Sequence, residues 1–321
     1  MTAPTVKDHK KEKYVVACIV ICIVLIEVTL RIVEDKLSAN IANIRTIPAT
    51  ATEIEKSEAE SILFIGNSLT DNAVDSILVS EHLQKQLSNN FNIFKVIPDS
   101  TGIADWYCIY QNQLRNISNP PTVVVIGFAW EQVSDQQPVT PGRLGGFFCK
   151  LSDLEPLSAT GMGHHQQQLQ FAVGAISHVY LNREAIRNRV LDLFIPKYIH
   201  ISRGMNQYAN EKNSSEDPVA RTYSYDLLID LAQQIRDSNS ELVIMAMPVI
   251  QPYALDPKLT EISSELGITL LDLRNTGDFD KSMYRDPIHL NKEGRTIFSR
   301  LIAQNLDHVL KNPRTAGVPA K

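Results

Sequence analysis

Five short apolar segments, separated by helix-like stretches, constrain the fold of this chain most. The predicted strands lie at 61–65, 91–97, 122–126, 241–247 and 269–273. The predicted helices lie at 71–87, 104–117, 223–238, 257–266 and 292–310. Strands that are apolar along their whole length are typical of parallel sheets, which are buried on both faces. Because strands and helices alternate, we expect an α/β fold with a five-stranded parallel sheet and helices on both of its faces.

The alternation is interrupted between the third and fourth predicted strands. Residues 131–150 contain prolines and glycines typical of loops, 166–194 have an amphipathic helical pattern, and 200–220 are polar. A structureless loop of this length would be unusual within a compact domain. We therefore expect an insertion or lid at about 131–220, inside a domain that spans 61–310 and precedes a tail at 311–321.

The amino-terminal segment has the pattern of a membrane anchor or a signal peptide. Four lysines between positions 7 and 13 precede an apolar run of twelve residues, Val15–Ile26. The run extends to residue 33 if Glu27 and Arg31 lie at the outer interface, and it is then long enough to span a bilayer. A cleaved signal peptide is the alternative, but the bulky Leu37 precedes the nearest small-residue site in a position that disfavours cleavage.

The lysines predict a single-pass topology with the amino terminus inside the cell. The expected parts are a cytoplasmic tail at 1–13, a transmembrane anchor at 14–33 and a stalk at 34–60, with the domain in the periplasm or outside the cell. In an exported domain Cys108 and Cys149 could form a disulfide. The net charge is −5 and the main body has no Lys/Arg-rich run, so a nucleic-acid partner is not expected.

Three segments that carry reactive or permissive residues are predicted at the carboxyl ends of strands, where ligands bind in open parallel sheets. Ser68 follows the first strand, Gly102 follows the second, and Asp286 and His289 precede the last helix. A serine hydroxyl becomes a nucleophile when a neighbouring base, oriented by an acid, takes its proton. Asp286 and His289 have a spacing that can hold a carboxylate and an imidazole together, and backbone N–H groups at Ser68 and Gly102 suit a developing oxyanion.

These segments resemble the SGNH, or GDSL-type, hydrolase family. Gly66–Leu69 matches the block GDSL with Asn67 in place of Asp, and residues 286–294 match D-x-x-H followed by L-N-x-x-G. The resemblance covers about 61–310 apart from the insertion, and it implies a flavodoxin-like three-layer α/β/α sandwich. It also implies Ser68 as nucleophile, His289 as general base and Asp286 as its orienting partner. The N–H groups of Ser68 and Gly102 would then form part of the oxyanion hole.

One block of the family is altered in this chain. The block G-x-N-D aligns with Gly127–Trp130, so Ala129 stands where an asparagine would donate its amide to the oxyanion hole. Loss of one such donor lowers a rate on the order of 100- to 1,000-fold. Similar changes occur in the membrane-anchored SGNH-like proteins of polysaccharide and cell-wall O-acylation that this chain resembles. Asn67, Trp130 and Glu131 are candidates for substrate contact.

The sequence therefore predicts a serine esterase or O-acyltransferase that acts on an extracytoplasmic polysaccharide or cell-envelope glycan through an acyl-serine. No cofactor is expected. The alternative is a non-catalytic glycan-binding or assembly subunit that partners a membrane-bound O-acyltransferase, which Ala129 favours and the Asp286/His289 pair opposes. A lipase or thioesterase of the same fold is a third candidate. The adjacent His164 and His165 point apart and have no partner at ligand spacing, so no metal site is expected.

Overall fold

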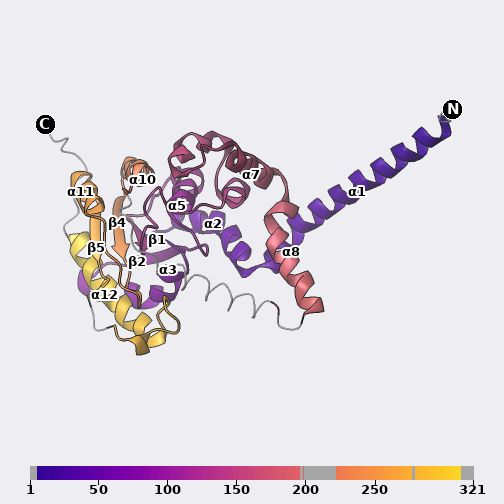
Figure 1. The fold of residues 1–321 in the computed structure, drawn as a ribbon. Coiled ribbons are helices and arrows are strands. Elements are labelled where there is room, and N and C mark those ends of the chain that lie inside the picture. Colours follow the sequence, from indigo (N-terminus) through magenta and orange to yellow (C-terminus); the bar gives the residue numbers. More distant parts are fainter. Residues whose placement is uncertain (1–5, 196–197, 199–221, 277–278, 312–321) are drawn as a thin grey trace.

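The centre of the protein is a parallel sheet, seen in a computed structural model that describes residues 6–195, 198, 222–276 and 279–311 (Figure 1). Its strands are β1 (Glu60–Ile65), β2 (Phe91–Val96), β3 (Val123–Phe128), β4 (Glu241–Ala246) and β5 (Thr269–Asp272). They are hydrogen-bonded in the order β2-β1-β3-β4-β5, and every pairing is parallel. The structure thus confirms the predicted five-stranded parallel sheet, and its order is that of flavodoxin-like folds.

Helices cover both faces of the sheet because side chains alternate along each strand. In β1, Ile62 and Phe64 enter one apolar layer, while Leu63 and Ile65 enter the other, and all four are fully buried. The first layer packs against α3 (Ser68–Ala73), α4 (Ser76–Leu87) and α12 (Lys292–Lys311). The second packs against α2 (Ala39–Glu55), α5 (Ile103–Ile109), α10 (Asp226–Asp237) and α11 (Pro257–Glu265). The three-layer α/β/α arrangement is the one predicted.

Two predicted helices are each divided in the structure by a capping side chain. Asp75 interrupts the predicted helix 71–87, because its carboxylate accepts hydrogen bonds from the N–H groups of Ile77 and Leu78 and so starts α4. In the insertion, the Oγ of Ser177 accepts from the N–H of Tyr180 and plays the same role. Ser177 therefore divides the predicted helix 166–194 into α7 (His165–Ile176) and α8 (His178–Phe194).

The predicted stalk is wrong in its central part, and residues 39–55 instead form α2, which packs on the sheet. Its buried side chains recur at helical spacing, and none of them is more than 8% exposed. They are Ile41, Ile44, Ile47, Ala51 and Ile54. Burial of each isoleucine contributes roughly 1.5–3 kcal/mol. The polar average composition of 34–60 conceals this narrow apolar stripe, which makes the segment part of the domain.

The amino-terminal helix α1 (Val6–Leu37) projects away from the domain (Figure 1). Its segment Lys11–Leu37 is long and apolar enough to cross a membrane, with a mean hydropathy of 2.7 in its most apolar window. None of that window is buried inside the protein. The helix is therefore consistent with the anchor predicted at 14–33, while residues 1–5 of the predicted tail lie outside the described residues.

The first part of the insertion is folded, although the sequence predicts a loop at 131–150. It contains α6 (Pro141–Arg143), a π-helical turn (Leu144–Phe148) and two short 3₁₀ helices (Leu151–Leu154 and Pro156–Thr160) before α7 and α8. Glycine allows this packing, since a Cβ on Gly174 of α7 would lie 2.1 Å from the carbonyl oxygen of Gly142. Most of the insertion after residue 195 and most of the tail at 311–321 lie outside the described residues.

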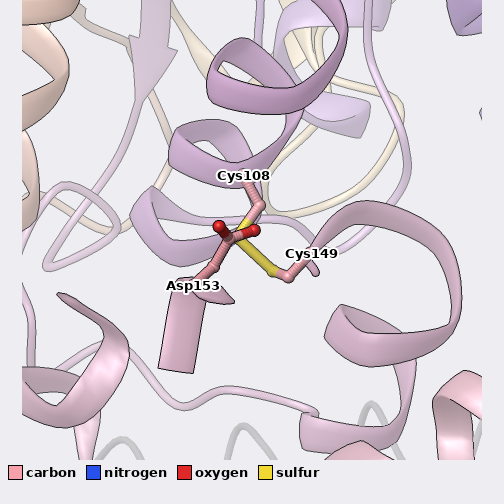
Figure 2. Close-up of side chains that lie close together, drawn as sticks. All are labelled: Cys108, Cys149 and Asp153. Carbon is pink, nitrogen blue, oxygen red and sulfur yellow. A yellow bond between two sulfur atoms is a disulfide. The ribbon is translucent and has the colours of Figure 1, made fainter. Parts of the chain in front are cut away.

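A disulfide joins Cys108 of α5 to Cys149, at the end of the π-helical turn (Figure 2). It ties the insertion to α5, in the helical layer on one face of the sheet. Asp153 lies beside the two sulfurs, and these three residues are close enough together to suggest a metal site. Both sulfurs are used by the disulfide, however, so neither is a free thiolate ligand.

Candidate active site

Ser68 lies at the carboxyl end of β1, as the first residue of α3. The preceding Asn67 caps this helix, because its Oδ1 accepts from the N–H of Leu69 at 3.0 Å. The Nδ2 of Asn67 donates to the carbonyl of Thr101, also at 3.0 Å. Asn67 is only 2% exposed, so the predicted substrate contact is corrected: its amide holds Ser68 in place from below the surface.

The turn before Ser68 is tight because α3 lies close to two strands. A Cβ on Gly66 would lie 2.1 Å from the Oγ1 of Thr70, and one on Gly127 would lie 2.4 Å from the same atom. Thr70 is buried and donates to the carbonyl of Gly127. Gly66 and Gly127 thus let α3 approach β1 and β3. This close approach determines how far Ser68 lies from the sheet.

Asp286 and His289 lie in the turn before α12. The Oδ1 of Asp286 accepts from the backbone N–H groups of Ile288 and His289, at 3.1 and 2.9 Å. The N–H of Arg285 in turn donates to the carbonyl of His289 at 3.0 Å. These bonds close the turn and place the carboxylate and the imidazole on one side of it, as the spacing of the two residues predicts.

The residues after His289 form the L-N-x-x-G part of the motif. Asn291 caps α12, since its Oδ1 accepts from the N–H groups of Glu293 and Gly294. Leu290 is 4% exposed and packs in the same apolar layer as α12. The L-N-x-x-G pattern therefore starts and seats the last helix, which fixes the direction in which His289 leaves the backbone.

The three predicted residues meet in one hydrogen-bonded chain. The Nε2 of His289 lies 2.9 Å from the Oγ of Ser68, and its Nδ1 lies 2.8 Å from the Oδ2 of Asp286. A carboxylate beside Nδ1 holds the ring proton there, which leaves Nε2 as an acceptor for the serine proton. The His289 side chain is 14% exposed and that of Asp286 is 29% exposed. This arrangement can activate Ser68 as a nucleophile.

Several contacts determine the charge state of Asp286. Burial desolvates its carboxyl group and acts to raise the pKa, but hydrogen bonds from the His289 ring and from two backbone N–H groups outweigh this effect. The net result is a pKa below the ordinary value for aspartate. Asp286 is therefore ionised in the folded protein and available to orient His289.

The lowered pKa predicts a stability change in acid. A carboxyl group with a depressed pKa in the folded state contributes stability above its unfolded pKa of about 3.9, and this contribution is lost as the pH falls through the folded value. We expect Asp286→Asn to flatten the fall in thermal unfolding midpoint of the full-length protein below about pH 5. Ser68→Ala retains the carboxylate and should keep the wild-type pH slope. Equal slopes for Asp286→Asn and wild type would contradict this account.

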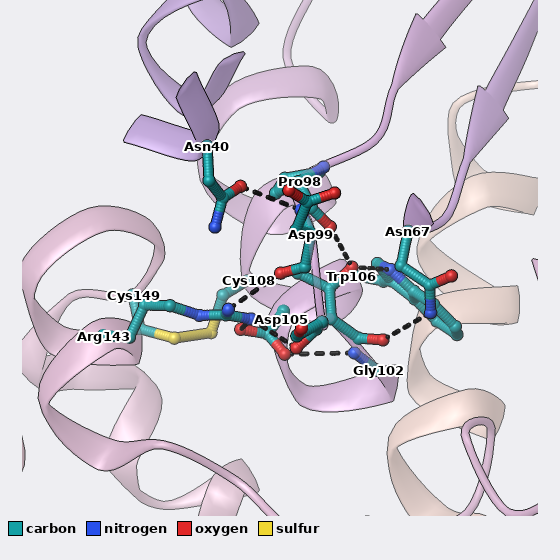
Figure 3. A network of polar contacts seen from close by, with 12 residues as sticks. Asn40, Asn67, Pro98, Asp99, Gly102, Asp105, Trp106, Cys108, Arg143 and Cys149 are labelled. Carbon is teal, nitrogen blue, oxygen red and sulfur yellow. Dashed lines mark hydrogen bonds and ion pairs between the residues drawn. A yellow bond between two sulfur atoms is a disulfide. The ribbon is translucent and has the colours of Figure 1, made fainter. Parts of the chain in front are cut away.

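Gly102 lies near the site, but its N–H does not face an open oxyanion position (Figure 3). It donates to the Oδ2 of Asp105 at 3.1 Å, while the other carboxylate oxygen accepts from Arg143 at 2.9 Å. Arg143 belongs to the insertion and also donates to the carbonyls of Asp99 and Ser100. The insertion therefore holds the loop after β2, and the predicted donor role of Gly102 is not present in this arrangement.

The remaining predicted contact residues follow β3. Trp130 and Glu131 are both half-buried. Trp130 has a φ of 51°, which is unusual for a bulky residue, and its ring packs against Tyr253 with centroids 5.7 Å apart. Substrate contact by these two side chains stays a prediction. Trp106, the other tryptophan of the chain, is fully buried and donates from Nε1 to the Oγ1 of Thr101.

One residue of this region, Gln132, is not among those that the sequence patterns single out. Ala129 is fully buried, and its N–H donates to the side-chain Oε1 of Gln132 at 3.0 Å. The backbone carbonyl of Gln132 accepts from the N–H of Ile103 at 2.9 Å, so Gln132 bridges the loops after β2 and β3. Its side chain ends in an amide, whose oxygen lies against the backbone of Ala129. The sequence feature that could have indicated Gln132 is an amide side chain three residues after Ala129.

Comparisons with known proteins add little to this geometry. No protein-family model matches the chain, and no curated protein matches it. A lipase/acylhydrolase from Enterococcus faecalis is among the similar solved structures, with 10% identity and a TM-score of 0.38, covering 78% of this chain and 96% of that one. A gut microbial diltiazem-metabolizing enzyme has 14% identity and a TM-score of 0.35, covering 77% of this chain and 47% of its own. The assignment of the site rests on the sequence motifs and on the observed geometry.

Proposed function

We propose that this protein is a serine esterase or O-acyltransferase in which Ser68 carries the acyl group. The observation that carries the proposal is the hydrogen-bonded chain from Asp286 through His289 to Ser68. Each of the three residues has one of the roles that nucleophilic catalysis by serine requires. A structural cap alone would not need the imidazole to lie between a carboxylate and a serine hydroxyl.

The reaction begins when the Oγ of Ser68 bonds to the carbonyl carbon of an ester. At the same time Nε2 of His289 takes the proton of the serine hydroxyl. The tetrahedral intermediate then collapses, the bond to the leaving oxygen breaks, and His289 gives its proton to that oxygen. Water or a sugar hydroxyl next attacks the acyl-serine, passing its proton to His289. Release of the acyl product returns this proton to Ser68. Asp286 holds the ring and stabilises its charged form throughout.

The oxyanion of each tetrahedral intermediate needs donors. The backbone N–H of Ser68 is one candidate, and we include the side-chain amide of Gln132 as a second because it lies beside Ala129. In this proposal the amide comes from a different position from that in the family block. In this role Gln132 would replace the donor that Ala129 lacks.

The proposed substrate is an ester of an extracytoplasmic glycan. The apolar α1 and the Cys108–Cys149 disulfide support a membrane-anchored domain outside the cytoplasm. The second candidate is a non-catalytic subunit that binds glycan beside a membrane-bound O-acyltransferase. It is favoured by Ala129 and by the engagement of the Gly102 N–H with Asp105.

A fluorophosphonate probe tests the catalytic proposal. We expect the full-length protein in detergent to be labelled at Ser68, identified by the mass of the modified peptide, and Ser68→Ala to remain unlabelled. Incubation with an acetylated polysaccharide should release acetate or move it to an added oligosaccharide, which separates hydrolysis from transfer. Absence of labelling, together with equal acetate release by wild type and Ser68→Ala, would favour the non-catalytic subunit.

A further inference from the structure

The outer face of α7 carries exposed apolar side chains. Leu169, Val173 and Ile176 recur at helical spacing, and Leu169 and Ile176 are 64% and 72% exposed. The opposite face of the helix holds the buried Phe171 and Gly174. The helix contains no Asp, Glu, Lys or Arg from its first residue to its last. His165 and Gln166 are also exposed, so the outer face combines apolar side chains with uncharged polar ones. Exposed apolar side chains among polar ones suit contact with a headgroup layer.

The carboxylate of Glu27, on α1, holds the turn between α7 and α8. Glu27 accepts from the Oγ of Ser177 and from the N–H groups of His178 and Val179, and thereby caps α8. Glu27 is the first residue after the twelve-residue apolar run that ends at Ile26. The apolar segment is long enough to span a bilayer when it extends to residue 33, with Glu27 and Arg31 at the outer interface. The turn between α7 and α8, which Glu27 caps, then lies at that interface.

Further polar contacts make this joint firm. Glu34 is 1% exposed, and its carboxylate accepts from Arg45 of α2 at 2.5 Å and from Asn182 of α8 at 3.0 Å. Arg189 donates to the carbonyls of Lys36 and Leu37 at the end of α1. Because α1 is bound to both α2 and α8, it meets the domain at a fixed angle. Figure 1 shows α7 and α8 on the side of the domain from which α1 projects.

We propose that the α7 face, formed by Leu169, Val173 and Ile176, lies in the headgroup layer of the bilayer that α1 spans. This inference rests on the membrane anchoring included in the proposed function. Contact with lipid removes exposed apolar surface from water, and a charge-free helix has no ionised side chain to desolvate there. A bilayer fits better than a second copy of the chain because Glu27, at the outer interface of the span, is hydrogen-bonded to the turn that ends α7.

The same contacts link this face to the site. The α7 helix packs on Gly142, and the adjacent Arg143 holds the loop that contains Gly102. The Cys108–Cys149 disulfide joins this part of the insertion to α5. A face seated in the headgroups would therefore hold the site at a constant height and orientation above the membrane.

Lipid-borne quenching tests the inference in the full-length protein, reconstituted in phosphatidylcholine vesicles. Cys18 and Cys22 are replaced by alanine, and Ile176→Cys or Leu169→Cys is labelled with an environment-sensitive fluorophore. Ile77→Cys is the matched control, because Ile77 on α4 is 70% exposed but lies in the layer on the other face of the sheet. A variant that retains only Cys18 of the two free cysteines reports insertion of α1.

We expect a nitroxide near the lipid headgroup to quench labels at 169 and 176 at least about twofold more than the label at 77. Quenching equal to that at 77 would overturn the inference, as would a label hidden from both lipid nitroxide and aqueous iodide, which would indicate a protein partner. An unquenched Cys18 label would also overturn it, because α1 would then not be inserted. Phosphonate labelling of Ser68 reports separately on the proposed catalysis.

Discussion

Replacing His289 with alanine should lower kcat/KM for an activated acetyl ester by about 10⁴-fold or more. The expected loss is large because Nε2 lies 2.9 Å from the Ser68 Oγ and is the base positioned to take its proton. Without it the hydroxyl remains protonated near neutral pH and is a poor nucleophile. Initial rates of ester hydrolysis and the rate of phosphonate labelling both measure this effect.

The double variant Ser68→Ala/His289→Ala distinguishes a catalytic unit from two independent contributions. Residues that act as a unit are not additive, so the double variant should be about as slow as either single variant. His164→Ala is the matched control, because this exposed histidine belongs to the insertion and should leave the rate unchanged. A loss of only a few-fold in His289→Ala would contradict the proposed base.

The sheet can be predicted from the sequence because its strands are continuous apolar runs between helices. β3 (Val123–Phe128) is buried along its whole length, as such a run predicts. The helix α2 is not evident from the sequence because its apolar stripe is narrow and most of its other residues are polar. The folded part of the insertion is equally hard to predict, since close contacts such as that between Gly142 and Gly174 depend on tertiary packing.

The site is predictable where short motifs carry it. The turn from Asp286 to His289 is local, so the spacing of these residues gives their relation directly. The contact of His289 with Ser68 spans the chain, and it is indicated by the predicted place of both residues at the carboxyl ends of strands and by the resemblance to a family. The engagement of Gly102 with Asp105, and of Asp105 with Arg143, could not be predicted because the insertion has no counterpart in the matched blocks.

Replacing Gln132 with alanine should lower kcat for ester hydrolysis by about 100- to 1,000-fold, with a smaller change in KM. The side chain of Gln132 accepts from the N–H of Ala129, and its Nε2 is the proposed oxyanion donor. A donor that acts on the tetrahedral intermediate stabilises the transition state more than the bound ester. Steady-state kinetics of the full-length protein with an activated acetyl ester measure both constants.

Gln132→Glu separates this donor role from a structural one. Glutamate can still accept from the N–H of Ala129, but its carboxylate has no N–H to donate to an oxyanion, and its negative charge would oppose one. If Gln132 only holds the turn, Gln132→Glu should retain most of the activity that Gln132→Ala loses. If it donates to the oxyanion, both variants should be slow while the thermal unfolding midpoint of Gln132→Glu stays near that of wild type. Retained activity in Gln132→Glu would therefore contradict the proposed donor role of Gln132.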